Sequence, residues 1–344
     1  MMGNAMLIAV SAPPNTIGLQ GLNMTHILLT GAGFSRNWGG VLAHEVFQRL
    51  IGDGTSEALR NLLWRARSAG QNFEDVLAAL QGATDHQGKA LCAELISLLV
   101  GIFNGMGQAF MQMQFEFPAQ PSVQRSLRAF LTRFDMIFTL NQDTLMEQKY
   151  LPTVMDQRWA KAAVPGMKFI NPGAFQGSVL DRIAPMEPNP GEFKFHPAIQ
   201  PYVKLHGSAN WVESTSGGRI LVMGGAKAIT IGKFPILAWY HEEFKKALLR
   251  PGAKLMVMGY SFSDAHINEA IMESIRRNKL KVFIVDPAGE SILDKRDPRA
   301  MIPAPETELM RTVRPAICGL SIRPLTSTFN DDVYEHDNLS SFFK

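Results

Sequence analysis

The chain has 344 residues, of which 46% are hydrophobic and 19% are charged, and its formal net charge is +3 at pH 7. This composition excludes a disordered chain and a strongly polycationic binder. The length fits one large α/β domain with insertions or two ordinary domains. The chain has two cysteines, Cys92 and Cys318, so it can build neither a disulfide framework nor a four-cysteine zinc site, which favours a reducing compartment.

No segment of the sequence is expected to cross a membrane. The most apolar stretch, residues 91–113, is interrupted by Glu94, Asn104, Gln108 and three glycines, so we expect a buried helix or a pair of helices there. The apolar residues 6–10 are too few for a signal peptide and follow no basic residue. The sequence therefore predicts a cytoplasmic protein without a membrane anchor.

The first part of the chain divides into an extension, a strand and a long helical insertion. Residues 1–23 lack hydrophobic periodicity and predict a flexible N-terminal extension. The apolar run at residues 26–30 ends abruptly at glycine, as a buried strand feeding a tight loop would. Residues 41–133 then show apolar residues at helical spacing and no strand pattern. This interval predicts helices at residues 41–50, 59–66, 73–80, 89–113 and 123–132.

Strand-like apolar runs recur in the remainder of the chain. They occupy residues 136–140, 202–205, 220–223, 254–258, 281–285 and 320–323. Helices are predicted between them, at residues 236–249 and 265–277. The alternation predicts an α/β fold with a Rossmann-like, mostly parallel sheet and helices on both faces. We expect this domain to span residues 24–330 and a helical tail to follow at residues 331–344.

Ligands of an open parallel sheet bind beyond the carboxyl ends of its strands, and glycine-rich or polar loops follow four of the predicted strands. The first loop, GAGFSR at residues 31–36, resembles a dinucleotide-binding turn because its glycines let backbone N–H groups approach a phosphate. Its sixth position is Arg36, and no acidic residue ends a second strand about twenty positions later. A hydride-transfer dehydrogenase is therefore disfavoured, and a simple tight turn remains the alternative.

The other three loops carry polar side chains that could contact a ligand. Asn141 and Asp143 could both address a ribose, although an N-cap and turn would use the same residues. His206 could act as a base or donor, or it could be purely structural. Gly259 and Ser261 form a glycine–serine turn before a helix, which repeats the anion-binding geometry of the first loop.

Together, the four loops resemble the sirtuin family. The matching segments are GAGFS at 31–35, TLNQD at 139–143, KLHGS at 204–208 and GYSFSDAHIN at 259–268. The resemblance spans residues 25–286 and implies a Rossmann-type domain that binds NAD⁺. It implies that the pyrophosphate and phosphates contact Gly31, Ala32, Gly33, Phe34, Ser35, Gly259 and Ser261, the nicotinamide ribose contacts Asn141, Asp143 and His206, and the adenosine ribose contacts Asp286.

The departures from the family pattern change the expected activity. Sirtuins that deacylate proteins carry a zinc module with two Cys-x-x-Cys pairs after the histidine loop, whereas residues 211–225 contain no cysteine. Residues 37–40 (NWGG) also replace the proline and phenylalanine–arginine of the deacylases. What remains is similar to the sirtuin-like NAD⁺ hydrolases of bacterial anti-phage defence. That resemblance implies a homo-oligomer and a possible HerA-like ATPase partner.

The resemblance implies that NAD⁺ is the substrate and is cleaved to nicotinamide and ADP-ribose, with no metal required. Asn141 would orient the attacking water or the leaving nicotinamide, and Asp143 would hold the ribose and stabilise its positive charge. His206 would accept a proton from a ribose hydroxyl or from the water. A zinc-free NAD-dependent deacylase and a non-catalytic sensor of NAD⁺ or ADP-ribose remain alternatives.

Three further patterns have structural interpretations. Basic residues at 60–67, 276–281 and 295–299 are mixed with acids or spaced like solvated helix faces, so direct nucleic-acid binding is disfavoured. Asp264, His266 and Asn268 imitate metal ligands, but their position predicts helix capping and loop locking, with no third cluster to complete a metal site. The helical insertion could be a lid or an assembly surface, or it could simply pack over the sheet.

Overall fold

The computed structural model describes residues 24–52, 54–117, 125–154, 156–170, 184–214, 217–225, 227–294, 296 and 305–344. The N-terminal extension expected at residues 1–23 lies outside the described residues. So does most of the basic cluster at 295–299.

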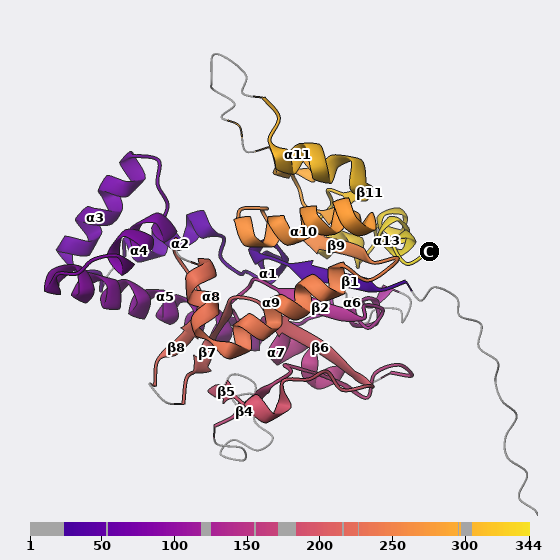
Figure 1. Cartoon of the computed structure of the whole chain (residues 1–344), viewed down its shortest axis with the longest axis horizontal. Coiled ribbons are helices and arrows are strands. Elements are labelled where there is room, and N and C mark those ends of the chain that lie inside the picture. The colour runs from indigo at the N-terminus through magenta and orange to yellow at the C-terminus, as the bar shows by residue number, and fades with distance from the viewer. Residues whose placement is uncertain are drawn as a thin grey trace, which may run out of the picture.

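A seven-stranded sheet forms the centre of the molecule, and all of its strand pairs are parallel. The strands lie in the order β11-β10-β9-β1-β2-β6-β3. Their bounds are β1 His26–Thr30, β2 Met136–Thr139, β3 Lys161–Ala163, β6 Ile199–Lys204, β9 Lys254–Met258, β10 Lys281–Val285 and β11 Ile317–Ser321. Helices surround this sheet (Figure 1), which confirms the predicted α/β, Rossmann-like fold.

The order of the strands reverses between β1 and β9. From β1 the chain adds β2, β3 and β6 on one side of the sheet and then returns to add β9, β10 and β11 on the other. A reversal of this kind leaves a crevice outside the carboxyl ends of the two central strands. The first and fourth predicted loops follow β1 and β9, so both open into that crevice.

Glycines allow these two loops to touch. A Cβ atom added to Gly31 would lie 2.5 Å from the carbonyl oxygen of Gly259, and one added to Gly259 would lie 2.3 Å from the backbone nitrogen of Phe34. Gly259 also has a φ of +61°, in the left-handed region that L side chains rarely adopt. Close backbone contact, together with this turn, therefore requires glycine on both loops.

Helices fill the interval between β1 and β2, where the sequence predicts no strand. Figure 1 shows α2 to α5 gathered beside the end of the sheet where β1 runs into α1. The last helix of the interval begins later than predicted, at Leu127, because Ser126 is its N-cap and accepts a hydrogen bond from the Ala129 N–H. The bounds are α1 Ala32–Arg36, α2 Ala43–Leu50, α3 Glu57–Ser68, α4 Phe73–Gln81, α5 His86–Gln112 and α6 Leu127–Leu131.

Helix α5 differs from the buried helix that we predicted from its composition. Its most apolar window has a mean hydropathy of 1.7, yet only 17% of that window is buried. By length and composition alone, α5 could cross a membrane, a test that core helices of soluble proteins also pass. Leu95, Leu99, Met106 and Phe110 form its buried stripe against the rest of the fold. The prediction of a helix was right, but beside this stripe its other apolar side chains, such as Leu91, Ile96 and Phe103, are only partly buried against the core.

A second, four-stranded sheet was not predicted. Its order is β4-β5-β7-β8; β4 and β5 precede β6 in the chain, whereas β7 and β8 follow His206. The run at residues 220–223, which we predicted as a strand of the main sheet, instead contributes β8 to this second sheet and pairs with β7. The bounds are β4 Met167–Phe169, β5 Met186–Pro188, β7 Gly207–Val212 and β8 Arg219–Leu221. Three of them, β4, β5 and β8, have three residues each and are too short for sequence periodicity to distinguish them from loops.

The remaining helices cover the sheet, and the end of the chain after the last helix packs against β1. Helices α9 and α10 lie side by side across one face (Figure 1). At the C-terminus, the rings of Phe342 and Phe343 that follow α13 contact His26 of β1, and the Arg133 guanidinium lies 3.9 Å from the Phe343 ring centre. The bounds are α7 Leu145–Lys149, α8 Lys227–Lys233, α9 Pro235–Leu248, α10 Ala265–Asn278, α11 Glu308–Val313, α12 Leu325–Thr328 and α13 Val333–Ser341.

The contact between the two glycine loops gives a first prediction. Gly259→Ala should lower the free energy of unfolding by about 1–3 kcal/mol, because the new methyl group overlaps the backbone of the first loop and the φ is strained. Urea denaturation followed by circular dichroism measures the change. Gly101→Ala is the matched control, since a Cβ there meets nothing within 4 Å and α5 should gain about 0.5–1 kcal/mol. Equal stability of the two variants would contradict the close contact.

Candidate functional site

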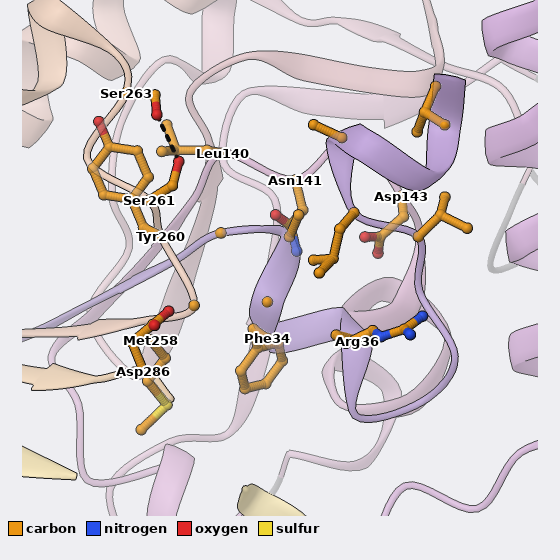
Figure 2. A pocket seen from close by; sticks show the side chains of 18 of the residues that line it. Phe34, Arg36, Leu140, Asn141, Asp143, Met258, Tyr260, Ser261, Ser263 and Asp286 are labelled. Carbon is orange, nitrogen blue, oxygen red and sulfur yellow. Dashed lines mark hydrogen bonds between the residues drawn. The ribbon is translucent and has the colours of Figure 1, made fainter. Parts of the chain in front are cut away.

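A cavity of about 730 Å³ opens at the crevice between the carboxyl ends of β1 and β9. This volume lies within the range of about 300–1,000 Å³ that is usual for ligand sites. Figure 2 shows Asn141 between the Ser261 side of the cavity and Asp143, with Asp286 beside Met258. The predicted site residues that line this cavity are Gly31, Ala32, Gly33, Phe34, Asn141, Asp143, His206, Gly259, Ser261 and Asp286.

Ser35 is the one predicted contact that does not line the cavity. Its side chain is 2% exposed, and its hydroxyl accepts a hydrogen bond of 2.9 Å from Asn141 Nδ2. Ser35 therefore supports a lining residue and does not reach the ligand space itself.

The glycine loop differs from the phosphate cradle that we predicted. The Gly31 N–H donates to the Met258 carbonyl at 3.0 Å, and the Gly33 N–H donates to the Gly259 carbonyl at 2.9 Å. A third N–H, that of Phe34, donates back to Gly31. Since these donors are already used within the protein, the glycines serve mainly to bring the two loops into contact. A ligand phosphate would meet the outer surface of the paired loops.

Asn141 is held in a single orientation at the end of β2. Its backbone N–H donates to Thr139 Oγ1 at 3.0 Å, and its side-chain nitrogen donates to Ser35. Among the described residues, no hydrogen bond uses its side-chain oxygen. Since the nitrogen is directed at Ser35, the amide oxygen remains available to a ligand or a water molecule in the cavity.

The second sheet holds the Asn141 loop in place. Gln142 Nε2 donates to the Val222 carbonyl at 2.6 Å, and the Gln142 carbonyl accepts from the Ala209 N–H at 3.0 Å. The same sheet holds the histidine loop, because Val222 N–H donates to the His206 carbonyl at 2.9 Å. The unpredicted strands thus fix two of the four candidate loops relative to each other.

A buried ion pair supports Asp143. Lys204, fully buried at the end of β6, donates to the Asp143 carbonyl and lies 2.6 Å from Glu147 Oε1 of α7. The Asp143 carboxylate accepts from the Leu145 N–H at 3.0 Å, so the turn that we considered as an alternative is present. The same carboxylate lines the cavity, and the two roles coexist.

His206 is 3% exposed and belongs to a group of three imidazoles. Its Nε2 atom lies 3.1 Å from Nε2 of His266. The His241 ring lies beside both, and its Nε2 donates to the Leu205 carbonyl at 2.9 Å. Burial lowers the pKa of His206 well below its ordinary value and that of His241 to about 4. Near neutral pH both rings are therefore uncharged, and His206 can accept a proton.

The fourth loop is locked by its own side chains. Asn268 Nδ2 donates to the Phe262 carbonyl at 2.8 Å, and Tyr260 Oη donates to Asn268 Oδ1 at 3.1 Å. Phe262 adopts a φ of +51° inside this loop. The prediction that Asn268 locks the loop is thus confirmed.

Asp264 does not cap α10 as we predicted. Its side chain makes no capping hydrogen bond and pairs instead with Lys227 Nζ at 2.6 Å. Lys227 also lies 2.9 Å from Glu74 of α4. Burial alone would lower the pKa of Lys227, but the two carboxylates outweigh burial and raise it above its ordinary value. This chain of charges joins the helical insertion to the fourth loop, and all three residues line the cavity.

The helical insertion supplies one wall of the cavity. Phe103 and Met106 of α5 and Phe73 of α4 line it, together with the start of α2. The insertion is anchored beside the glycine loop by Trp38, whose indole N–H donates to the Phe115 carbonyl at 3.1 Å and whose ring stacks on that of Phe115. The insertion therefore does more than cover the sheet, because it shapes the ligand space.

The chain also matches a known protein family. Residues 135–304 match the family model of the SIR2-like domain. The match supports a sirtuin-like family and an NAD-related activity, since SIR2-like domains are commonly NAD-dependent enzymes. It begins just before β2 and includes the second, third and fourth loops, whereas the first glycine loop precedes it. A search of curated proteins finds no match.

Four polar residues of this site were not given roles from the sequence: Glu74, Glu147, Lys204 and Lys227. Lys204 stands within the KLHGS segment, so its position was visible although its partner was not. Lys227 and Glu74 lie far apart in sequence, and no local pattern pairs them. Their roles follow from tertiary contacts alone.

The buried pair beside Asp143 gives a second prediction. Lys204→Met should lower the free energy of unfolding by about 3–5 kcal/mol, because Glu147 would keep a buried charge without its partner. Adding Glu147→Leu should restore most of the loss. The surface control Lys246→Met, which breaks an exposed pair with Glu243, should change stability little. Urea denaturation compares the variants, and equal effects of Lys204→Met and Lys246→Met would contradict a structural role for the buried pair.

Proposed function

We propose that this protein is an NAD⁺ hydrolase that cleaves the bond between nicotinamide and ribose C1′ and releases nicotinamide and ADP-ribose. The observation that carries the proposal is the shared cavity of Asn141, Asp143 and His206, next to two glycine loops at the switch point of a parallel sheet. The SIR2-like match over residues 135–304 supports an NAD-related activity at this place.

The order of the loops along the sheet suits an extended dinucleotide. Asp286 follows β10, Gly259 follows β9, Gly31 follows β1, Asn141 lies beyond β2 and His206 lies beyond β6, and these five strands are consecutive neighbours. With strands about 4.8 Å apart, the row from β10 to β6 spans about 19 Å. The adenosine ribose would lie near Asp286, the phosphates over the paired glycine loops, and the nicotinamide ribose near the three polar residues.

Cleavage of the bond between nicotinamide and ribose requires a site that stabilises positive charge on the ribose and positions one water molecule. As the glycosidic bond breaks, the ribose acquires oxocarbenium character, which the Asp143 carboxylate would stabilise. The Asn141 amide, held by Ser35, would orient the water or the leaving nicotinamide. His206, kept neutral by burial, would accept a proton from a ribose hydroxyl or from the water. The residues present need no metal for these steps.

Two variants test these roles and give a third prediction. Asn141→Ala and His206→Ala should each reduce NAD⁺ loss at least about 100-fold, in line with the contribution of a positioned acid–base group. Loss of NAD⁺ and formation of ADP-ribose are measured by chromatography on the purified full chain. His196→Ala is the matched control, because His196 is exposed and lies outside the cavity. Wild-type turnover by both cavity variants would reject the proposed roles.

The product separates hydrolysis from deacylation. With NAD⁺ and an acetylated peptide present together, the proposed hydrolase should give plain ADP-ribose, and the peptide should keep its acetyl group. Formation of O-acetyl-ADP-ribose would instead support a zinc-free deacylase. Binding of NAD⁺ without any turnover, with or without a co-encoded neighbour, would support a sensor.

We further propose that the hydrolase is a cytoplasmic effector of bacterial anti-phage defence, that it forms a homo-oligomer and that a HerA-like ATPase is its partner. The resemblance of the four loops to such hydrolases supports the role. Support for assembly also comes from α5, because many apolar side chains of this long helix are only partly buried in the single chain and could be covered further by a protein contact.

Oligomer formation is a fourth prediction. Size-exclusion chromatography with light scattering should give a mass that is a multiple of the 38.1 kDa chain at micromolar concentration. The multiple reflects burial of apolar surface that the single chain leaves exposed. A monomer at all concentrations, with and without the ATPase, would count against this part of the proposal.

A further inference from the structure

Two imidazoles and a carboxylate converge at one side of the cavity, although one of the imidazoles lies sixty residues away in the chain. Nε2 of His206 and Nε2 of His266 are 3.1 Å apart, and one carboxylate oxygen of Asp264 completes a group whose ligand atoms all lie within 4.8 Å of one another. His206 comes from the loop after β6, whereas Asp264 and His266 come from the start of α10. The sequence contained no third ligand beside Asp264 and His266, and the fold supplies it.

The distances between these atoms suit a small divalent cation. Zinc binds imidazole nitrogen at about 2.0–2.1 Å in tetrahedral geometry, which places two ligating nitrogens about 3.3 Å apart. The observed 3.1 Å requires an outward shift of only a few tenths of an ångström. Without a cation, two neutral imidazoles facing each other through Nε2 must share one proton between them. A metal ion would replace that proton and use both nitrogens.

The donor types also fit. Two imidazole nitrogens and one carboxylate oxygen are ligands that zinc sites with three protein ligands use. The Lys227 pair uses Oδ1 of Asp264, and the carboxylate has a second oxygen. Glu74 balances part of the Lys227 charge that would oppose a cation.

We propose that His206, His266 and Asp264 form a binding site for a divalent transition-metal ion of the zinc class. Imidazole favours zinc and its neighbours over magnesium or calcium, which prefer oxygen ligands. His206 and Asp264 both line the cavity, so the fourth coordination position faces the ligand space, as in zinc sites that have three protein ligands and an open position.

A regulatory consequence rests on the proposed function. A metal ion on Nε2 of His206 occupies the nitrogen that would otherwise accept a proton, and it lies at the end of the cavity where the nicotinamide ribose would bind. Zinc and NAD⁺ turnover therefore exclude each other. The ion would act as a reversible inhibitor of the hydrolase.

Metal binding is tested first without any activity measurement. The full chain is treated with a chelator, and zinc chloride alone is titrated in by isothermal calorimetry. We expect one zinc ion per chain, with affinity reduced at least tenfold in His206→Ala and in His266→Gln. The second variant keeps a polar side chain of similar length, and circular dichroism checks that both variants fold. Cobalt(II) in place of zinc should give the visible absorption of a four-coordinate ion.

The matched control is His196→Ala, which removes an exposed histidine paired with Glu192 and should leave the affinity unchanged. Absence of binding, or unaltered affinity in folded His266→Gln, would overturn the metal site. So would loss of binding in His196→Ala.

The effect of zinc on NAD⁺ loss is measured in a separate experiment. Zinc should block NAD⁺ loss by the wild-type chain, the chelator should restore it, and the turnover that His266→Gln retains should resist zinc. If the chain binds zinc but never consumes NAD⁺, the metal site stands and the proposed function fails. If it consumes NAD⁺ but binds no zinc, the reverse holds.

Discussion

The contact between the loops after β1 and β9 is the constraint on which the site depends. Gly33 N–H donates to the Gly259 carbonyl at 2.9 Å, and neither loop leaves room for a Cβ atom on Gly31 or Gly259. Because the strand order reverses between these two strands, their loops border a crevice that neither face of the sheet covers. The cavity opens at this contact and is also lined by residues that follow β2 and β6.

Around that contact, three separate structures position the polar side chains. The second sheet holds the Asn141 and His206 loops through Gln142 and Val222. The buried Lys204–Glu147 pair fixes the backbone of Asp143. The insertion closes the cavity from the side of α4 and α5 and is joined to the fourth loop through Lys227. A site built on loops is thus supported by helices and strands on three sides, which limits the reorganisation that binding requires.

The cluster of His206, His241 and His266 is the feature that both proposals use. Removal from water lowers the pKa of the three rings. Under the proposed function His206 would accept a proton, whereas in the proposed metal site the same Nε2 atom would bind zinc, so the two proposed uses would compete.

The sequence by itself determined six of the seven strands of the central sheet, the helical character of the insertion and the places where glycine and polar residues end strands. These features depend on short-range periodicity and on turn chemistry, which a local stretch of chain records. Only the tertiary structure decided that the three-residue strand β3 joins the edge of that sheet, that residues 219–221 belong to a second sheet, that α5 is only partly buried, and that Asp264 meets Lys227. Those outcomes depend on which distant segments pack together, as His206 and His266 do across sixty residues, and no local pattern encodes such a pairing.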